Sequence, residues 1–197
     1  MPRKRSVKKC ARQFETAVSG VQVFADAATK TNLTDSQISW VYEYAIIALY
    51  RALESMILDA LVGAINNDTA VVSKTLGVKL PPHLRNEVCR FLVTGTGYFD
   101  FKGRNGLIRT LKKFVPESHY LVQTIKKQRY KPTLEQLSAL RNFATHDSPQ
   151  AKRAALAAIG LARMSSVGAW LKRQQRLNTL TANLGRLAKE IRQAAPY

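Results

Sequence analysis

The chain has 197 residues, of which 46% are hydrophobic, and its 31 lysines and arginines against 13 acidic residues give a formal net charge of +18. This length favours one domain, or one domain with an extra helix, and the hydrophobic content argues against wholesale disorder. The longest nearly apolar run, residues 45–50, is too short for a membrane span of about 20 residues, and two cysteines with three scattered histidines give neither a disulfide framework nor zinc-ligand spacing.

The first expected element is a basic N-terminal helix within residues 1–31, because apolar residues recur at three- and four-residue steps over residues 6–29. A second helix begins at Thr34, whose side chain can form a capping box with that of Gln37, and it runs to about Ile65. Its apolar positions form a wide stripe. We therefore expect a long central helix that is buried on most sides.

Shorter elements are expected in the middle of the chain. Two prolines open a short helix over residues 81–93, and a loop rich in glycine and aromatic residues covers residues 95–106 without the Gly-Lys-Ser/Thr end of a Walker loop. A basic helix over residues 107–114 and another over residues 116–129 follow, and a second capping box at residues 133–136 opens the next helix. The loop aromatics either stack on bases or pack beneath the bundle, and we favour packing.

The last third of the chain predicts one or two long helices with a heptad pattern. One apolar position repeats every seven residues and is occupied by Trp170, Leu177, Leu184 and Ile191. A second apolar position, occupied by Leu180, Leu187 and Ala194, completes a coiled-coil-like seam. The seam either packs inside its own chain, which we slightly favour, or joins two copies. The predicted fold class is therefore all-α: a helical bundle with a long central helix and an added C-terminal heptad-patterned helix.

The positive charge predicts attraction to a polyanion, which RNA, DNA or anionic lipid would satisfy. It is concentrated in residues 102–131 and 148–197, whereas residues 32–68 are net acidic. We expect a cluster of five basic side chains to follow RNA phosphates, with a solvated face as the alternative. These residues are Lys112, Lys113, Lys126, Lys127 and Arg129.

One segment has residues suited to catalysis. Ser148-Pro149 reads as a helix start, so the preceding helix should end near Thr145, with Arg141 in its last turn and His146 just beyond. A bend there can bring the imidazole toward the guanidinium. Histidine can take the proton of a ribose 2′-hydroxyl near neutral pH, and arginine can stabilise the extra charge on the phosphorus oxygens. The alternative is an arginine favoured by the helix dipole beside a surface histidine.

Arg141-Asn142-x-x-x-His146, at the end of a helix in an all-α chain, resembles the motif of the HEPN superfamily. These are helical-bundle proteins, many of them metal-independent endoribonucleases with an Arg-x4-6-His motif. The resemblance includes residues 50–56, the loop at residues 97–102 and the leucines before Arg141, and it covers roughly residues 36–165. We therefore expect an N-terminal helix (1–31), a HEPN-like core (32–165) and a C-terminal basic helix (166–197).

The resemblance implies a site at the cleft of a homodimer, where two Arg/His pairs meet. His146 would be the base or general acid, Arg141 the phosphate clamp, Asn142 an orienting residue and Glu54 a supporting acid from the central helix. Glu54 reads equally well as a buried ion-pair partner. Ser148 stands where many HEPN toxins place Tyr, which argues against a toxin–antitoxin pair of the nucleotidyltransferase type.

The expected function is cleavage of RNA to 2′,3′-cyclic phosphate ends, in antiviral defence or stress, without metal or cofactor. The expected location is the cytoplasm, and the expected partners are RNA, a second copy and a regulatory protein, with no membrane. A non-catalytic HEPN-like nucleic-acid-binding or scaffold protein is the alternative. A third, weaker interpretation is a peripheral membrane protein attached through its basic helices.

Overall fold

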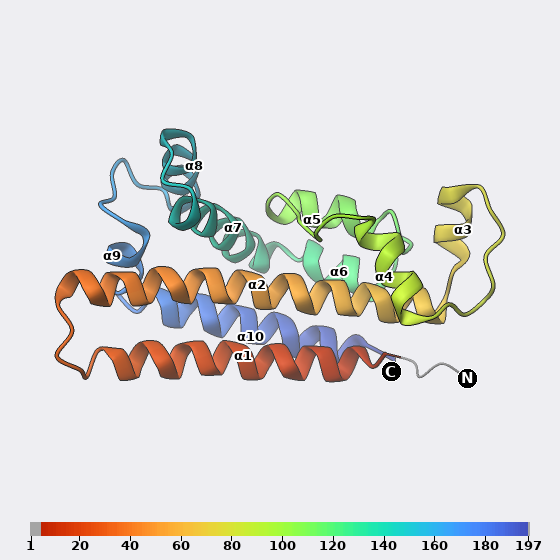
Figure 1. The fold of residues 1–197 in the computed structure, drawn as a ribbon, viewed down its shortest axis with the longest axis horizontal. Helices are drawn as coiled ribbons and strands as arrows, with labels where there is room; N and C mark the ends of the chain where they lie inside the picture. The colour runs from red at the N-terminus through yellow and green to blue at the C-terminus, as the bar shows by residue number, and fades with distance from the viewer. Residues whose placement is uncertain (1–4, 197) are drawn as a thin grey trace.

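The structure is a computed structural model that describes residues 5–196, and every regular element among them is helical (Figure 1). The all-α prediction is thereby confirmed. Residues 1–4 of the expected N-terminal helix lie outside the described residues. In chain order the elements are α1 (Val7–Ala28), α2 (Asp35–Asn67), α3 (Ala70–Leu76), α4 (Asn86–Thr94), α5 (Gly103–Leu111), α6 (Tyr120–Lys126), η1 (Gln128–Tyr130), α7 (Lys131–Thr145), α8 (Pro149–Ile159), α9 (Val167–Leu171) and α10 (Arg176–Ala194).

The central helix of the bundle is α2, with 33 residues. Figure 1 shows α1 and α10 running along one side of it and α4 to α9 gathered on the other. One hydrophobic cluster joins residues of α1, α2, α5, α6, α7, α9 and α10. The three expected units, residues 1–31, 32–165 and 166–197, therefore all contribute to one core. A smaller cluster at the far end of α2 adds Val72 of α3 and Cys89 of α4.

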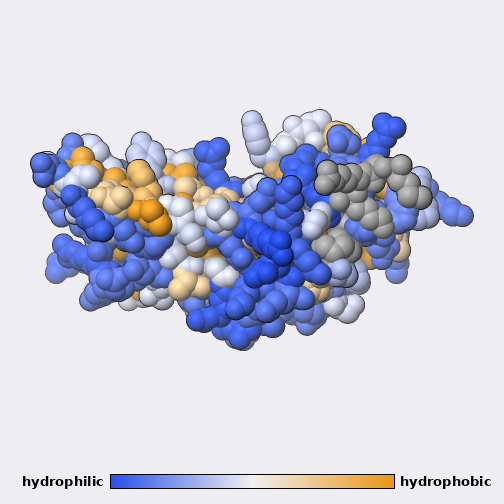
Figure 2. Space-filling view, turned by 90° about the horizontal axis from the view of Figure 1, so that it is seen from below, coloured by the Kyte–Doolittle hydropathy of each residue, from blue (hydrophilic) through white to orange (hydrophobic). Residues whose placement is uncertain are grey.

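The C-terminal heptad leucines are buried within the chain. Leu177, Leu184 and Leu187 of α10 are fully covered, and α10 packs along α1. Each such side chain contributes about 1.5–3 kcal/mol through burial. The interpretation as a bundle helix is therefore confirmed. Figure 2 shows that the surface seen from below, on the side of α1, is largely hydrophilic, with hydrophobic residues gathered toward the left end.

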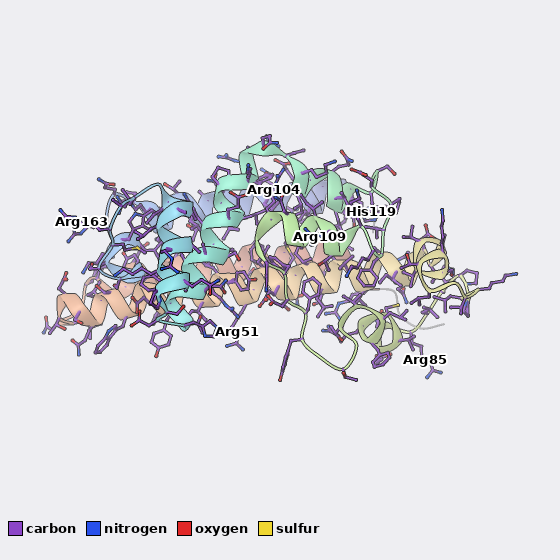
Figure 3. The ribbon with its side chains drawn as sticks, turned by 90° about the horizontal axis from the view of Figure 1, so that it is seen from above. Arg51, Arg85, Arg104, Arg109, His119 and Arg163 are labelled. Atoms are coloured by element: carbon purple, nitrogen blue, oxygen red, sulfur yellow. The ribbon has the colours of Figure 1, made fainter. Side chains whose placement is uncertain are left out.

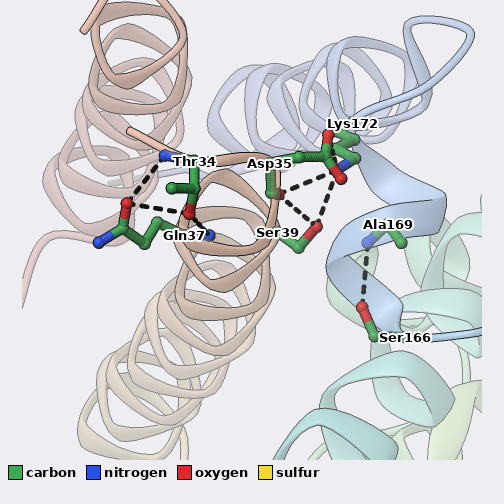
Figure 4. A network of polar contacts seen from close by, with 7 residues as sticks. All are labelled: Thr34, Asp35, Gln37, Ser39, Ser166, Ala169 and Lys172. Atoms are coloured by element: carbon green, nitrogen blue, oxygen red, sulfur yellow. Dashed lines mark hydrogen bonds and ion pairs between the residues drawn. The ribbon is translucent and has the colours of Figure 1, made fainter. Parts of the chain in front are cut away.

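The start of α2 is fixed by the predicted capping box (Figure 4). The hydroxyl of Thr34 accepts from the backbone N–H of Gln37 at 3.3 Å, and the Thr34 N–H donates to the Gln37 side chain at 2.8 Å. Lys172, at the end of α9, forms an ion pair with Asp35 at 2.6 Å and donates to the Ser39 hydroxyl at 2.9 Å. These contacts hold α9 against the first turns of α2.

Two predicted helix starts were wrong, and at each of them a polar group is hydrogen-bonded to a residue distant in sequence. The helix expected from residue 81 begins at Asn86, since the carbonyl of Pro81 accepts from Thr69 at 2.8 Å and that of Leu84 accepts from Asn66. The second capping box does not form. Helix α7 already begins at Lys131, and the buried Thr133 hydroxyl instead accepts from Asn183 at 3.1 Å.

Three other boundaries differ from the prediction. The last residues of the expected 95–106 loop are helical, because α5 begins at Gly103. The helix expected over 116–129 is split into α6 and η1, because the buried Arg104 donates to the carbonyls of Ile125 and Lys126. Trp170 lies on α9 rather than on the helix of the heptad leucines, because the backbone at residues 174–175 is left-handed, with φ of 54°.

We predict that Gly168→Ala lowers the free energy of unfolding by about 1–3 kcal/mol or more. A Cβ at this position would lie 1.8 Å from the backbone oxygen of Ser39, and backbone cannot rotate away. Urea denaturation followed by circular dichroism measures the change. Gly185→Ala is the matched control, because open space surrounds its Cβ, and it should stabilise by roughly 0.5–1 kcal/mol. Equal midpoints for the two variants would contradict the close approach of α9 to α2.

Candidate functional site

The predicted break after Thr145 is present. Helix α7 ends at Thr145, and the N–H of His146 closes its last turn on the Asn142 carbonyl at 2.9 Å. Ser148 caps α8 by accepting from the N–H of Ala151 at 3.1 Å, with Pro149 in the first helical position. The chain therefore turns between the two helices, as the serine–proline pair predicts.

Arg141 is half-buried on α7 and faces the side chain of Tyr50 on α2. Its guanidinium carbon lies 4.8 Å from the centre of the Tyr50 ring, which is within the range of a cation–π contact. One terminal nitrogen donates to the side-chain oxygen of Asn142 at 3.0 Å, whereas Nε is buried without a partner among the described residues. No described carboxylate forms an ion pair with Arg141, although its charge acts on the nearby Glu54.

Tyr50 joins α2 to the loop that precedes α5. Its buried hydroxyl donates to the carbonyl of Phe101 at 2.8 Å, and the two rings lie 5.4 Å apart. Burial, with the negative charges of Glu54 and Asp100, raises the pKa of Tyr50 far above its usual value. The hydroxyl therefore stays a hydrogen-bond donor, and it anchors the loop beside Arg141.

Glu54 lies one turn after Tyr50 on α2 and is half-buried. Burial raises its pKa to about 7, and this outweighs the opposing attraction of Arg141 and Arg51. From the sequence, Glu54 could equally have been a buried ion-pair partner. No basic group of the described residues forms an ion pair with it. A carboxyl group that titrates near neutral pH can accept or donate a proton in catalysis.

Arg141 and Glu54 line one open cleft of about 730 Å³, which we call the Arg141 cleft. Its lining comes from α2, α4, α7 and the loop at residues 95–102: Arg51, Glu54, Ser55, Leu58, Arg90, Tyr98, Phe99, Asp100 and Arg141. The structure thus brings two of the predicted catalytic residues together, with Asn142 against Arg141. Of this lining, sequence reasoning missed Arg51, Arg90 and Asp100. Asp100 lies in the glycine-rich loop, and Arg51 follows Tyr50 directly on α2, but no sequence signal points to Arg90 on α4.

His146 does not line this cleft. It is exposed at the end of α7, and its imidazole forms no hydrogen bond or ion pair with the described residues. Within one chain the arginine and the carboxyl group therefore share a cavity, whereas His146 is exposed outside it. The bend after Thr145 thus does not bring the imidazole into the cleft beside the guanidinium, contrary to our expectation from the sequence.

The five predicted RNA-binding residues lie on the surface around α5, α6 and η1. Lys112 and Lys126 both pair with Glu117, at 2.8 and 2.7 Å, and Lys127 and Arg129 both pair with Glu190. Lys113 is exposed and forms no ion pair among the described residues. Each carboxylate serves two cations, so this surface keeps a positive excess.

Within residues 5–196, no three acidic, histidine or cysteine side chains are grouped as metal ligands. No described helix combines the length and apolar character needed to cross a membrane. In the comparisons with known proteins, no family model, no curated protein and no solved structure matches this chain. The resemblance to HEPN proteins therefore stays a prediction that rests on the residues quoted above.

We predict a pH dependence of stability that originates at Glu54. Between pH 4.5 and pH 7 the folded state holds a proton on Glu54 that the unfolded chain has released. The contribution of Glu54 to the free energy of unfolding is therefore complete below pH 4.5 and is lost as the pH rises toward 7. Glu54→Gln, which stays neutral, should gain on the order of 1 kcal/mol over the wild type between pH 5 and pH 8, after allowance for solvent screening. Urea denaturation at both pH values measures this gain.

Glu190→Gln is the control for this prediction. Although burial raises the pKa of Glu190, hydrogen bonds from Lys127, Tyr130 and Arg129 outweigh it and lower the pKa to about 2. Its protonation lies below the tested range, so its stability difference from the wild type should be the same at pH 5 and pH 8. A constant difference for Glu54→Gln as well would contradict the raised pKa.

Proposed function

We propose that this protein is a HEPN-like, metal-independent endoribonuclease that acts as a homodimer. The observation that carries the proposal is the environment of Arg141, a half-buried guanidinium without a carboxylate partner among the described residues, at the end of the helix that exposes His146. Such a cation is suited to a phosphate group. The net charge of +18 supports a polyanionic substrate.

The reaction is an attack of the ribose 2′-oxygen on the adjacent phosphorus. His146 takes the proton of the 2′-hydroxyl, the new P–O2′ bond forms and the P–O5′ bond breaks, which leaves a 2′,3′-cyclic phosphate. Arg141 stabilises the charge that develops on the phosphorus oxygens. Glu54, with a pKa of about 7, is partly protonated at neutral pH and supplies the proton that the 5′-oxygen takes up.

A second copy is part of this proposal because His146 lies outside the Arg141 cleft of its own chain. When two copies meet at the ends of their α7 helices, each exposed imidazole can approach the other copy's cleft. This agrees with the dimeric site that the family resemblance implies. Action in antiviral defence or stress, in the cytoplasm and under a regulatory protein, belongs to the same proposal.

The second candidate is a non-catalytic RNA-binding or scaffold protein. The outward position of His146 favours it, because one chain alone does not place the imidazole beside Arg141. This candidate predicts salt-dependent RNA binding without cleavage.

We expect the purified protein to cleave single-stranded RNA in the presence of EDTA. His146→Ala and Arg141→Ala should each reduce the rate by about 10²–10⁴-fold, as expected for the loss of a base or of a charge-stabilising group. Gel analysis of end-labelled RNA and detection of 2′,3′-cyclic phosphate ends measure this. Circular dichroism verifies that the variants fold, and Arg141→Lys tests whether the charge alone is enough.

His83→Ala and Arg163→Ala are the controls, since both residues are exposed and lie outside the Arg141 cleft. They should cleave as the wild type does. If the four alanine variants cleave equally well, the proposed site is wrong. If the wild type binds RNA but leaves it intact, the second candidate replaces the first.

A further inference from the structure

The loop at residues 95–102 holds its three aromatic side chains in three different ways. Phe101 is buried against Tyr50, and Phe99 is half-buried with its ring 5.9 Å from that of Phe101, edge-on. Tyr98 is 98% exposed. Two aromatic anchors and the Tyr50 hydrogen bond thus attach the loop to the core, while the third ring remains in solvent. Our expectation that these aromatics pack beneath the bundle is correct for Phe101 and wrong for Tyr98.

A single exposed tyrosine is ordinary, but the surroundings of Tyr98 are not. It lines the Arg141 cleft together with three arginines. Arg51 is exposed, and neither Arg51 nor Arg141 forms an ion pair with any described residue. Figure 3 shows Arg51 on the edge of the molecule from which the loop between α4 and α5 projects.

The third arginine shares its partner. Arg90 pairs with Asp59 at 2.7 Å, and the same carboxylate also pairs with Arg5. One negative charge is therefore shared between two positive charges. The acidic residues of the lining are Glu54 and Asp100, and Glu54 is partly neutral at pH 7. The cleft therefore has an excess of positive charge beside an open aromatic ring.

We infer that the Arg141 cleft binds one unpaired nucleotide of an RNA strand, with the base stacked on Tyr98 and the flanking phosphate held by Arg51 and Arg141. Every base has a π-face, and stacking on aromatic side chains is the usual way in which proteins hold single strands. Bases inside a duplex are already stacked and cannot reach the ring. The volume of about 730 Å³ lies within the range of roughly 300–1,000 Å³ that small-molecule sites occupy.

This inference rests on the proposed function only in taking RNA as the ligand. It adds that the substrate is unpaired at the nucleotide next to the scissile phosphate. The reason is that Arg141 would contact the scissile phosphate and would also hold the phosphate that flanks the stacked base. Sequence preference would then come from the base that stacks on Tyr98, and structured RNA would be cut in loops and not in stems.

The test uses a single-stranded RNA oligonucleotide with 2′-O-methyl riboses and one 2-aminopurine. The methyl groups remove the attacking hydroxyl, so binding is measured without cleavage. Binding by the wild type should quench the 2-aminopurine fluorescence, which reports stacking. Tyr98→Ala should weaken binding by roughly 5- to 150-fold and abolish the quenching, whereas Tyr98→Phe should keep both.

Phe91→Ala is the matched control, because Phe91 is a 59% exposed aromatic residue on the neighbouring α4 outside the cleft lining. It should bind as the wild type does. Arg51→Gln should lower the slope of log affinity against log salt by about 0.7, the value for one phosphate contact on a single strand. Duplex RNA should bind Tyr98→Ala and the wild type equally.

The outcomes separate this inference from the proposed function. If Tyr98→Ala binds and quenches as the wild type does, or weakens duplex binding equally, the nucleotide subsite is wrong, whatever the cleavage assay gives. If the wild type does not cleave RNA but Tyr98→Ala loses binding and quenching, the subsite stands and the nuclease proposal fails.

Discussion

The candidate site depends on the position of the Tyr50 side chain. Its ring lies 5.4 Å from that of Phe101 and 4.8 Å from the guanidinium of Arg141, and its hydroxyl holds the Phe101 carbonyl. One buried side chain on the central helix thereby fixes both the loop that presents Tyr98 and the arginine opposite. Contacts within the chain and the close packing around this buried ring hold Tyr50, Phe101 and Arg141 together.

The fold could be predicted from the sequence where long apolar periodicity or a local cap determines the structure. The stripe of α1, the Thr34–Gln37 cap and the Ser148–Pro149 start are examples. Prediction failed where a distant group decides. Arg104 takes the carbonyls at the end of α6, and Asn183 contacts Thr133, and neither partner is near in sequence. The non-glycine residues with positive φ before α10 gave no local signal either.

The site shows the same division. Arg141 was singled out from its residue type and its place before a helix break, whereas Asn142 and Glu54 were expected only because of the resemblance to HEPN proteins. The end of α7 at Thr145 followed from the next helix start. The exposure of Tyr98 could not be predicted, because it depends on which loop aromatic meets Tyr50, and that is a tertiary contact. The roles of Arg141 and His146 in cleavage remain predictions.

On the surface around α5, α6 and η1, Glu117 and Glu190 are each shared between two basic side chains, and this affects how strongly the surface can bind a polyanion. Each carboxylate already neutralises part of two basic side chains, and hydrogen bonds keep the pKa of Glu117 near 2, so it stays charged at any ordinary pH. A phosphate that approaches these cations must compete with an anion that cannot leave. The five predicted RNA-binding cations therefore attract a phosphate less than their number suggests, and among the described residues Lys113 is the one of the five without an ion pair.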